Sequence, residues 1–237
     1  YASSKGSSIG LFNAVCYIGL TIGPILGVCL SKVCGEQEIF LIYFALCLCG
    51  AVLTLWLVED IRPNGHSDKV DFSQVTAMTK DGLALLTLLG ITLYGAGYSV
   101  LVTTLPVYLM QQKGFDHVYS GVFFSLFYIA ISVSQLVTGR LSDKSGPNRY
   151  MVLGLLDSSF GFAAAPYLSS RPALLAVLTV TSTGLGVFYL ASMIFLNETV
   201  DERFKGTVSG AYYLFFGHGL CFGAPIFSAA AKFAGNV

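Results

Sequence analysis

Residues 139–149 read GRLSDKSGPNR, and this polar segment joins two strongly apolar runs of the chain, 118–139 and 150–168. It holds three basic residues, one acidic residue, two glycines and a proline. Glycine permits tight backbone turns, and proline lacks the backbone N–H that continues a helix. We therefore expect a short charged connection between two helices, with Gly139 and Gly146 allowing a turn at the two helix ends.

The two neighbouring runs belong to a series of seven. Charged residues make up 11% of the chain, hydrophobic residues 54%, and the mean hydropathy is +0.72, whereas an ordinary soluble domain carries roughly 25% charged residues. A membrane-spanning helix needs about 20 mostly apolar residues. The composition thus predicts an all-α membrane protein with about seven transmembrane helices, at 9–30, 38–58, 82–110, 118–139, 150–168, 172–196 and 207–232.

The segment between the second and third runs, 59–81, is the only long connection, and its Pro63 and Gly65 argue against a helix interior. We expect it to link two helical halves, 1–58 and 82–237. Loops on the cytoplasmic side of a membrane carry an excess of Lys and Arg. Assigning alternate connections to one side places nine basic residues there against four on the other, which predicts a cytoplasmic linker and a cytoplasmic 140–149 loop.

The first and last runs share a pattern of glycines. Gly19, Gly23 and Gly27 are spaced by four and so share one helix face, where small residues let two helices approach closely. Five positions of the first run recur 200 residues later, with Pro24 matched one place further on by Pro225. The recurring residues are Lys5, Gly6, Gly10, Gly19 and Gly23, which become Lys205, Gly206, Gly210, Gly219 and Gly223. The repeat indicates a duplicated unit of six helices, an arrangement typical of secondary transporters.

These motifs resemble those of one family. The sequence Gly-x-Leu-Ser-Asp-Lys-x-Gly at 139–146 is similar to the loop signature of the major facilitator superfamily, which joins helices two and three and again eight and nine. The glycine motif of the first run (Gly10, Gly19, Gly23, Pro24 and Gly27) resembles the antiporter motif of helix five in the drug/proton branch. The resemblance covers nearly the whole chain and implies helices five to eleven of a twelve-helix, two-half fold.

The resemblance also implies a role for the 139–149 segment as a cytoplasmic latch. Its residues would be Gly139, Arg140, Asp143, Lys144, Gly146 and Arg149. A carboxylate at Asp143 can meet the positive end of a neighbouring helix, and the resemblance places it near the start of the first run, around Ser7 and Ser8. An exposed turn with a solvated Asp143 is the alternative. Pro147 and Asn148 replace basic residues that are usual in the family, which weakens the electrostatic part of such a latch.

Several residues are candidates to line a substrate cavity. Polar or aromatic side chains share faces within the apolar runs, and we select Asn13, Tyr17, Tyr98, Tyr128, Gln135 and Tyr212. Packing between helices is the alternative role for these residues. Ionisable groups inside a bilayer are costly and often functional. Two lie in the middle of predicted transmembrane helices. His218 is a candidate for proton coupling, whereas we expect Asp157 to pair helices, with a functional role as the alternative.

The resemblance implies a secondary transporter that moves small molecules by alternating access, specifically a proton-coupled efflux antiporter of amphipathic compounds. A nutrient symporter or uniporter of the same fold is the alternative, and the repeat excludes a seven-helix receptor. No phosphate-binding loop, metal-ligand cluster or activated nucleophile appears, so we assign no catalytic residue, metal or cofactor and expect no enzyme. We expect a monomer in the plasma (inner) membrane, with protons and a small molecule as partners and no nucleic acid.

Overall fold

The computed structural model describes residues 5–57, 76, 80, 82–200 and 204–233 of the chain. These residues form seven α-helices and one short 3₁₀-helix, and no strand occurs among them. The linker expected at 59–81 lies almost wholly outside the described residues. In chain order the elements are α1 (Lys5–Ser31), α2 (Glu36–Leu57), α4 (Gly82–Gln111), α5 (His117–Ser145), α6 (Asn148–Ala164), η2 (Ala165–Tyr167), α7 (Arg171–Glu198) and α8 (Lys205–Phe233).

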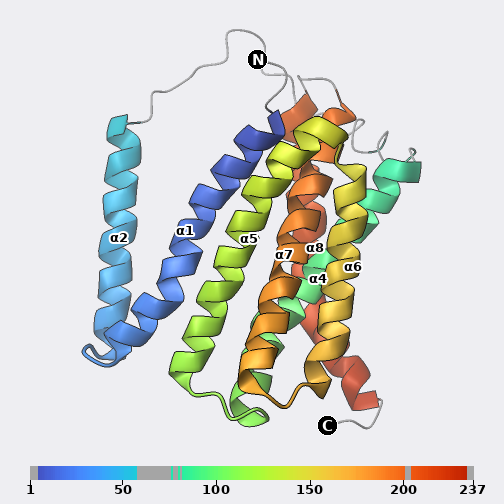
Figure 1. Ribbon diagram of the computed structural model, residues 1–237. Helices are drawn as coiled ribbons and strands as arrows, with labels where there is room; N and C mark the ends of the chain where they lie inside the picture. Colours follow the sequence, from blue (N-terminus) through green and yellow to red (C-terminus); the bar gives the residue numbers. More distant parts are fainter. Residues whose placement is uncertain (1–4, 58–75, 77–79, 81, 201–203, 234–237) are drawn as a thin grey trace.

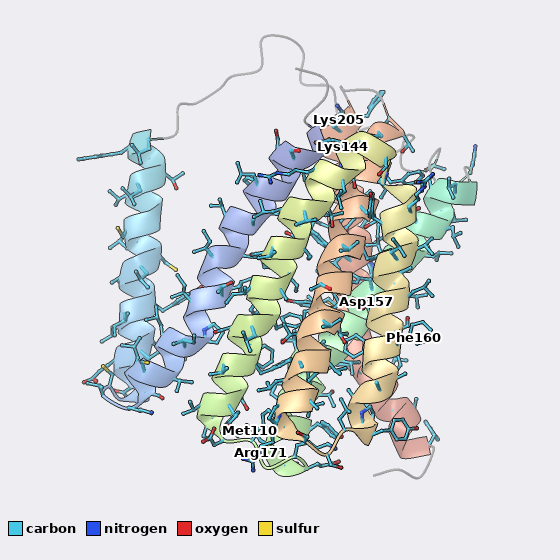
Figure 2. The ribbon with its side chains drawn as sticks, viewed as in Figure 1. Met110, Lys144, Asp157, Phe160, Arg171 and Lys205 are labelled. Atoms are coloured by element: carbon cyan, nitrogen blue, oxygen red, sulfur yellow. The ribbon has the colours of Figure 1, made fainter. Side chains whose placement is uncertain are left out.

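Six of these helices are long and apolar enough to cross a membrane, and α6, with 17 residues, is shorter than the others. Helices α4 to α8 form a bundle, α1 lies along α5, and α2 stands at the edge beyond α1 (Figure 1). The basic residues follow the expected alternation, since Lys144 and Lys205 lie at one end of the bundle and Arg171 at the other (Figure 2). The chain therefore has the architecture of a multi-pass integral membrane protein.

Helix α7 is the centre of the bundle, because it packs against α5 on one side and α6 on another and also contacts α8 and α4. Its residues Leu178, Phe188 and Leu190 are almost fully buried, as are Phe123 and Phe127 of α5. By contrast, nearly the whole described surface of α2 is exposed, including apolar side chains such as Phe40, Leu55 and Trp56. An apolar surface of this extent requires lipid or another helix to cover it.

One prediction about helix boundaries is wrong. We expected a turn beginning at Gly139, but α5 continues through it to Ser145. The physical reason is in the sequence, because no helix-breaking residue follows Gly139 until Gly146 and Pro147. Gly146 ends the helix with a φ of 78°, a backbone conformation that favours glycine, and its N–H donates to the carbonyl of Ser142 at 2.9 Å.

Candidate functional site

The Asp143 contact joins the end of α5 to the start of α1. One carboxylate oxygen of Asp143 accepts a hydrogen bond from the Gly6 N–H at 2.7 Å. The other accepts from the Ser7 N–H at 2.9 Å and from the Ser7 hydroxyl at 2.5 Å. The first N–H groups of a helix have no partner within it, and they carry partial positive charge. Asp143 therefore caps α1 from another helix, as the family resemblance implied, and α1 begins at Lys5.

Two glycines make this contact possible. A Cβ atom on Gly139 would lie 2.5 Å from the Gly6 carbonyl oxygen, and a Cβ on Gly6 would lie 2.8 Å from the Gly139 carbonyl oxygen and from Asp143. Gly139 thus serves close helix approach rather than the turn we expected. Of the other residues proposed for the latch, Arg140, Lys144 and Arg149 are exposed, so the cap rests on hydrogen bonds to the carboxylate.

A second site lies between α1 and the bundle, where seven aromatic rings surround a cavity of about 270 Å³. We call it the tyrosine cavity, and it is lined by Phe12, Asn13, Cys16, Tyr17, Leu20, Tyr94, Tyr98, Tyr189, Tyr213 and Phe216. The lining comes from α1, α4, α7 and α8. The cavity therefore sits between α1 and three helices of the bundle, with no carboxylate or basic group among its lining residues.

Contacts between aromatic side chains hold the walls of this cavity in place. Tyr17 stacks on Tyr128 with ring centroids 6.1 Å apart, and the hydroxyls of Tyr98 and Tyr128 are 3.2 Å apart. On the opposite wall, the hydroxyl of Tyr189 is 3.2 Å from that of Tyr213. Tyr128 thus supports two lining residues, Tyr17 and Tyr98, without lining the cavity itself.

Two buried amides lie at the seam between α1 and α5. Asn13 is 5% exposed and its Nδ2 has no hydrogen-bond partner, and Gln135 is fully buried with both amide atoms unpartnered among the described residues. Asn13 lines the cavity one helical turn from Tyr17, whereas Gln135 does not line it. A buried polar group without a partner is costly, so the Asn13 amide, which lines the cavity, is suited to a ligand's hydrogen-bonding group.

Tyr212 and His218 do not line the cavity. Tyr212 is buried, with its hydroxyl 3.2 Å from that of Ser192 and donating to the Tyr189 carbonyl at 3.2 Å. His218 is exposed on α8, and its Nδ1 is 2.8 Å from the Leu214 carbonyl one turn earlier. His218 therefore does not line the tyrosine cavity in this structure.

Sequence reasoning missed several lining residues, among them Tyr189 and Phe216. Each lies within a long apolar run where an aromatic residue looks like ordinary packing, and only the arrangement of α7 and α8 turns them toward α1. The signal that could have found Tyr189 is its spacing from Ser192, because these two residues and Gly186 give α7 a polar and small-residue face in mid-run.

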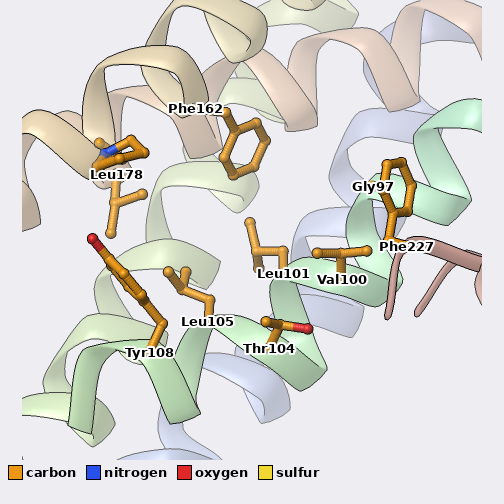
Figure 3. Close-up of a pocket in the computed structure, with 11 residues that line it drawn as sticks. Gly97, Val100, Leu101, Thr104, Leu105, Tyr108, Phe162, Leu178 and Phe227 are labelled. Carbon is orange, nitrogen blue, oxygen red and sulfur yellow. The ribbon is translucent and has the colours of Figure 1, made fainter. Parts of the chain in front are cut away.

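A larger cavity, of about 460 Å³, lies among α4, α6, α7 and α8 (Figure 3). Its walls are apolar except at Thr104 and Tyr108, with Leu101, Phe162 and Phe227 facing the space. It offers few groups that could select or orient a polar solute, and it does not reach α1. The tyrosine cavity is therefore the better candidate site. Among the described residues, no group of His, Cys, Asp and Glu is placed to hold a metal ion.

Comparison with known proteins agrees with this geometry. The family model described as Major Facilitator Superfamily matches residues 2–224. An uncharacterised MFS-type transporter of Methanocaldococcus jannaschii is 22% identical over 241 residues, a match that covers 97% of this chain and 60% of that protein. The synaptic vesicular amine transporters of mouse and human are 23% identical over 222 residues, covering 94% of this chain and 42% and 43% of theirs. The chain thus spans 60% or less of the length of these relatives.

Proposed function

The chain belongs to the major facilitator superfamily, and we propose that it forms part of a secondary transporter that exports amphipathic compounds in exchange for protons. The observation that carries the proposal is the tyrosine cavity at the seam between α1 and the bundle. A cavity at the contact between two halves is where alternating access requires the substrate to bind. Similarity to vesicular amine transporters supports a small organic substrate.

The lining chemistry supports amphipathic rather than strongly polar compounds. Seven aromatic rings offer apolar surface, ring faces that attract organic cations, and several hydroxyls, while Asn13 adds one amide. A site for a sugar or an organic acid needs more fixed hydrogen-bond partners or a basic residue. This lining favours the efflux proposal over the nutrient symporter, which remains the second candidate.

The proposed cycle uses the Asp143 contact as a latch. While Asp143 caps α1, the start of α1 and the end of α5 stay together at the end of the bundle that carries Lys144 and Lys205. We propose that this end faces the cytoplasm, in the plasma (inner) membrane, with the protein acting as a monomer. Breaking the cap would let α1 separate from α5 and open the tyrosine cavity to that side.

Transport by the full-length protein tests the proposal. A lipophilic cationic dye, rhodamine 6G, would be followed in proteoliposomes with and without an imposed proton gradient. We expect gradient-dependent dye movement that is lost on adding a protonophore. Dye movement that is equal with and without the gradient would contradict proton coupling. If the dye does not move but a polar solute is taken up when the gradient is imposed, the nutrient carrier is favoured.

A further inference from the structure

A separate groove lies among α5, α6 and α7 and shares no lining residue with the tyrosine cavity. Its volume is about 360 Å³. Aliphatic side chains form most of its walls, and Val133, Val137 and Leu153 are half exposed there, so the groove opens on the outer surface of the described bundle. In a membrane that surface faces the lipid or a helix outside the described chain.

The groove contains one carboxyl group, Asp157, halfway along α6. Figure 2 shows Asp157 between α6 and α7. The hydroxyl of Thr183 donates to the Val180 carbonyl at 2.7 Å and also lies 3.3 Å from Asp157 Oδ2. A hydroxyl carries a single proton, and the shorter contact with Val180 takes it. Asp157 thus competes with the Val180 carbonyl for the single hydroxyl proton of Thr183, and none of the residues lining the groove is basic.

The packing of α6 on α7 leaves room for this carboxyl group. A Cβ atom on Gly184 would lie 2.6 Å from Asp157 Oδ2 and 2.7 Å from the carbonyl oxygen of Gly154. The absence of a side chain at Gly184 thus keeps the carboxyl group beside α7 and within the groove. While the Thr183 hydroxyl donates to the Val180 carbonyl, its oxygen can accept a hydrogen bond next to Asp157.

We propose that this groove binds a lipophilic ammonium cation that reaches it from the lipid phase. An N–H donor of the ammonium group would find two neighbouring acceptors, the Asp157 carboxylate and the Thr183 hydroxyl oxygen, while the apolar body fills the aliphatic walls. An isolated carboxylate inside a bilayer is costly unless it is paired, and a monovalent cation supplies that pairing. The proposal does not depend on transport through the tyrosine cavity.

Chemical labelling of the full-length protein in lipid nanodiscs tests this site. Dicyclohexylcarbodiimide enters lipid and adds whole to a protonated carboxyl group: the carboxyl oxygen bonds to the carbodiimide carbon, and the proton passes to a nitrogen. Peptide mass spectrometry would quantify the adduct at Asp157. We expect 1-adamantanamine to lower the labelling about tenfold or more, since pairing with a charged donor is strong. The neutral 1-adamantanol, which has the same cage, should leave it nearly unchanged.

Binding measurements on variants distinguish the contribution of the Asp157 carboxyl group from general affinity for apolar surfaces. Asp157→Asn should lower the binding of radiolabelled 1-adamantanamine about tenfold or more, whereas Glu198→Gln, a matched charge removal at the exposed end of α7, should not. Leu153→Trp, on the exposed rim where a larger side chain fits without disturbing the core, should also reduce binding by filling the groove. Equal protection by the amine and the alcohol, or binding unchanged in both groove variants, would overturn the proposal.

Discussion

The carboxylate of Asp143 accepts three hydrogen bonds from the first turn of α1. A hydrogen bond to a charged group contributes about 1.5–3 kcal/mol, so loss of this side chain weakens the contact between that end of α1 and α5. We expect Asp143→Ala to lower gradient-driven dye transport about tenfold or more. Ser7→Ala removes only the hydroxyl donor and should have a smaller effect.

The same transport assay checks both variants, with Glu198→Gln as a control for removal of an exposed charge at the same end of the bundle. All three proteins should insert and remain folded, as judged by their elution from a sizing column. If Asp143→Ala transports dye at the unaltered rate, the carboxylate does not control the cycle and the contact is only structural.

Tyr17 contributes a ring and a hydroxyl to the tyrosine cavity, and two substitutions can distinguish their effects on dye binding. The ring stacks on Tyr128, and such aromatic pairs contribute about 0.5–1.5 kcal/mol beyond the area they bury. We expect Tyr17→Phe to keep rhodamine 6G affinity within about twofold and Tyr17→Leu to lower it about tenfold. Fluorescence anisotropy with the full-length protein in detergent measures both, and equal losses in the two variants would show that the hydroxyl, not the ring, binds the dye.

At the scale of helices, α4 and α8 pack so closely that a single methyl group should disturb them. A Cβ atom on Gly95 would collide with the Phe216 carbonyl oxygen, whereas one on Gly97 would meet nothing within 4 Å. Overpacking a tight contact costs about 1–3 kcal/mol, so Gly95→Ala should lower the melting temperature and Gly97→Ala should not. Thermal unfolding of the full-length protein compares the two, and equal melting temperatures would contradict the close packing.

The repeated glycines are used differently in the two helices that carry them. In α8, a Cβ atom on Gly219 or Gly223 would collide with the α4 backbone, whereas Gly19 and Gly23 of α1 have open space around them. The repeat predicts that Gly19 and Gly23 meet a helix equivalent to α4, in the part of the relatives' length that this chain does not span. Gly19→Val should then destabilise the full-length protein as Gly219→Val does. A melting temperature unchanged by Gly19→Val alone would contradict this equivalence.

The helices and the Asp143 contact follow from local signals in the sequence. Long apolar runs, the GRLSDKSGPNR segment and the family resemblance predict the seven helices and place Asp143 at the start of α1. The boundary error at Gly139 arose because glycine serves both turns and close helix contacts, and one sequence does not distinguish them. Tyr189 and Phe216 could not be assigned to the cavity. A helix that is apolar all round has no periodic pattern in its sequence, so the face that it turns toward its neighbours cannot be predicted.

At the scale of the whole molecule, α1 contacts α5 along its length. A Cβ on Gly139 would meet Gly6 at one end, and a Cβ on Gly121 would lie 3.0 Å from Val28 at the other. The tyrosine cavity lies beside this contact, between α1 and the bundle. Alternating access requires α1 to separate from α5 at one end while the other end stays closed.

Distances between spin labels at the two ends of this contact test the central claim most directly. Labels on unnatural amino acids, chosen because the chain has six free cysteines, would be placed at Ser8 and Lys144 for the Asp143 end and at Lys32 and Val118 for the other. With rhodamine 6G and a proton gradient, we predict a longer component in the Ser8–Lys144 distances and no lengthening between Lys32 and Val118. Unchanged distances at both ends with dye bound, or lengthening at both ends together, would contradict alternating access around the tyrosine cavity.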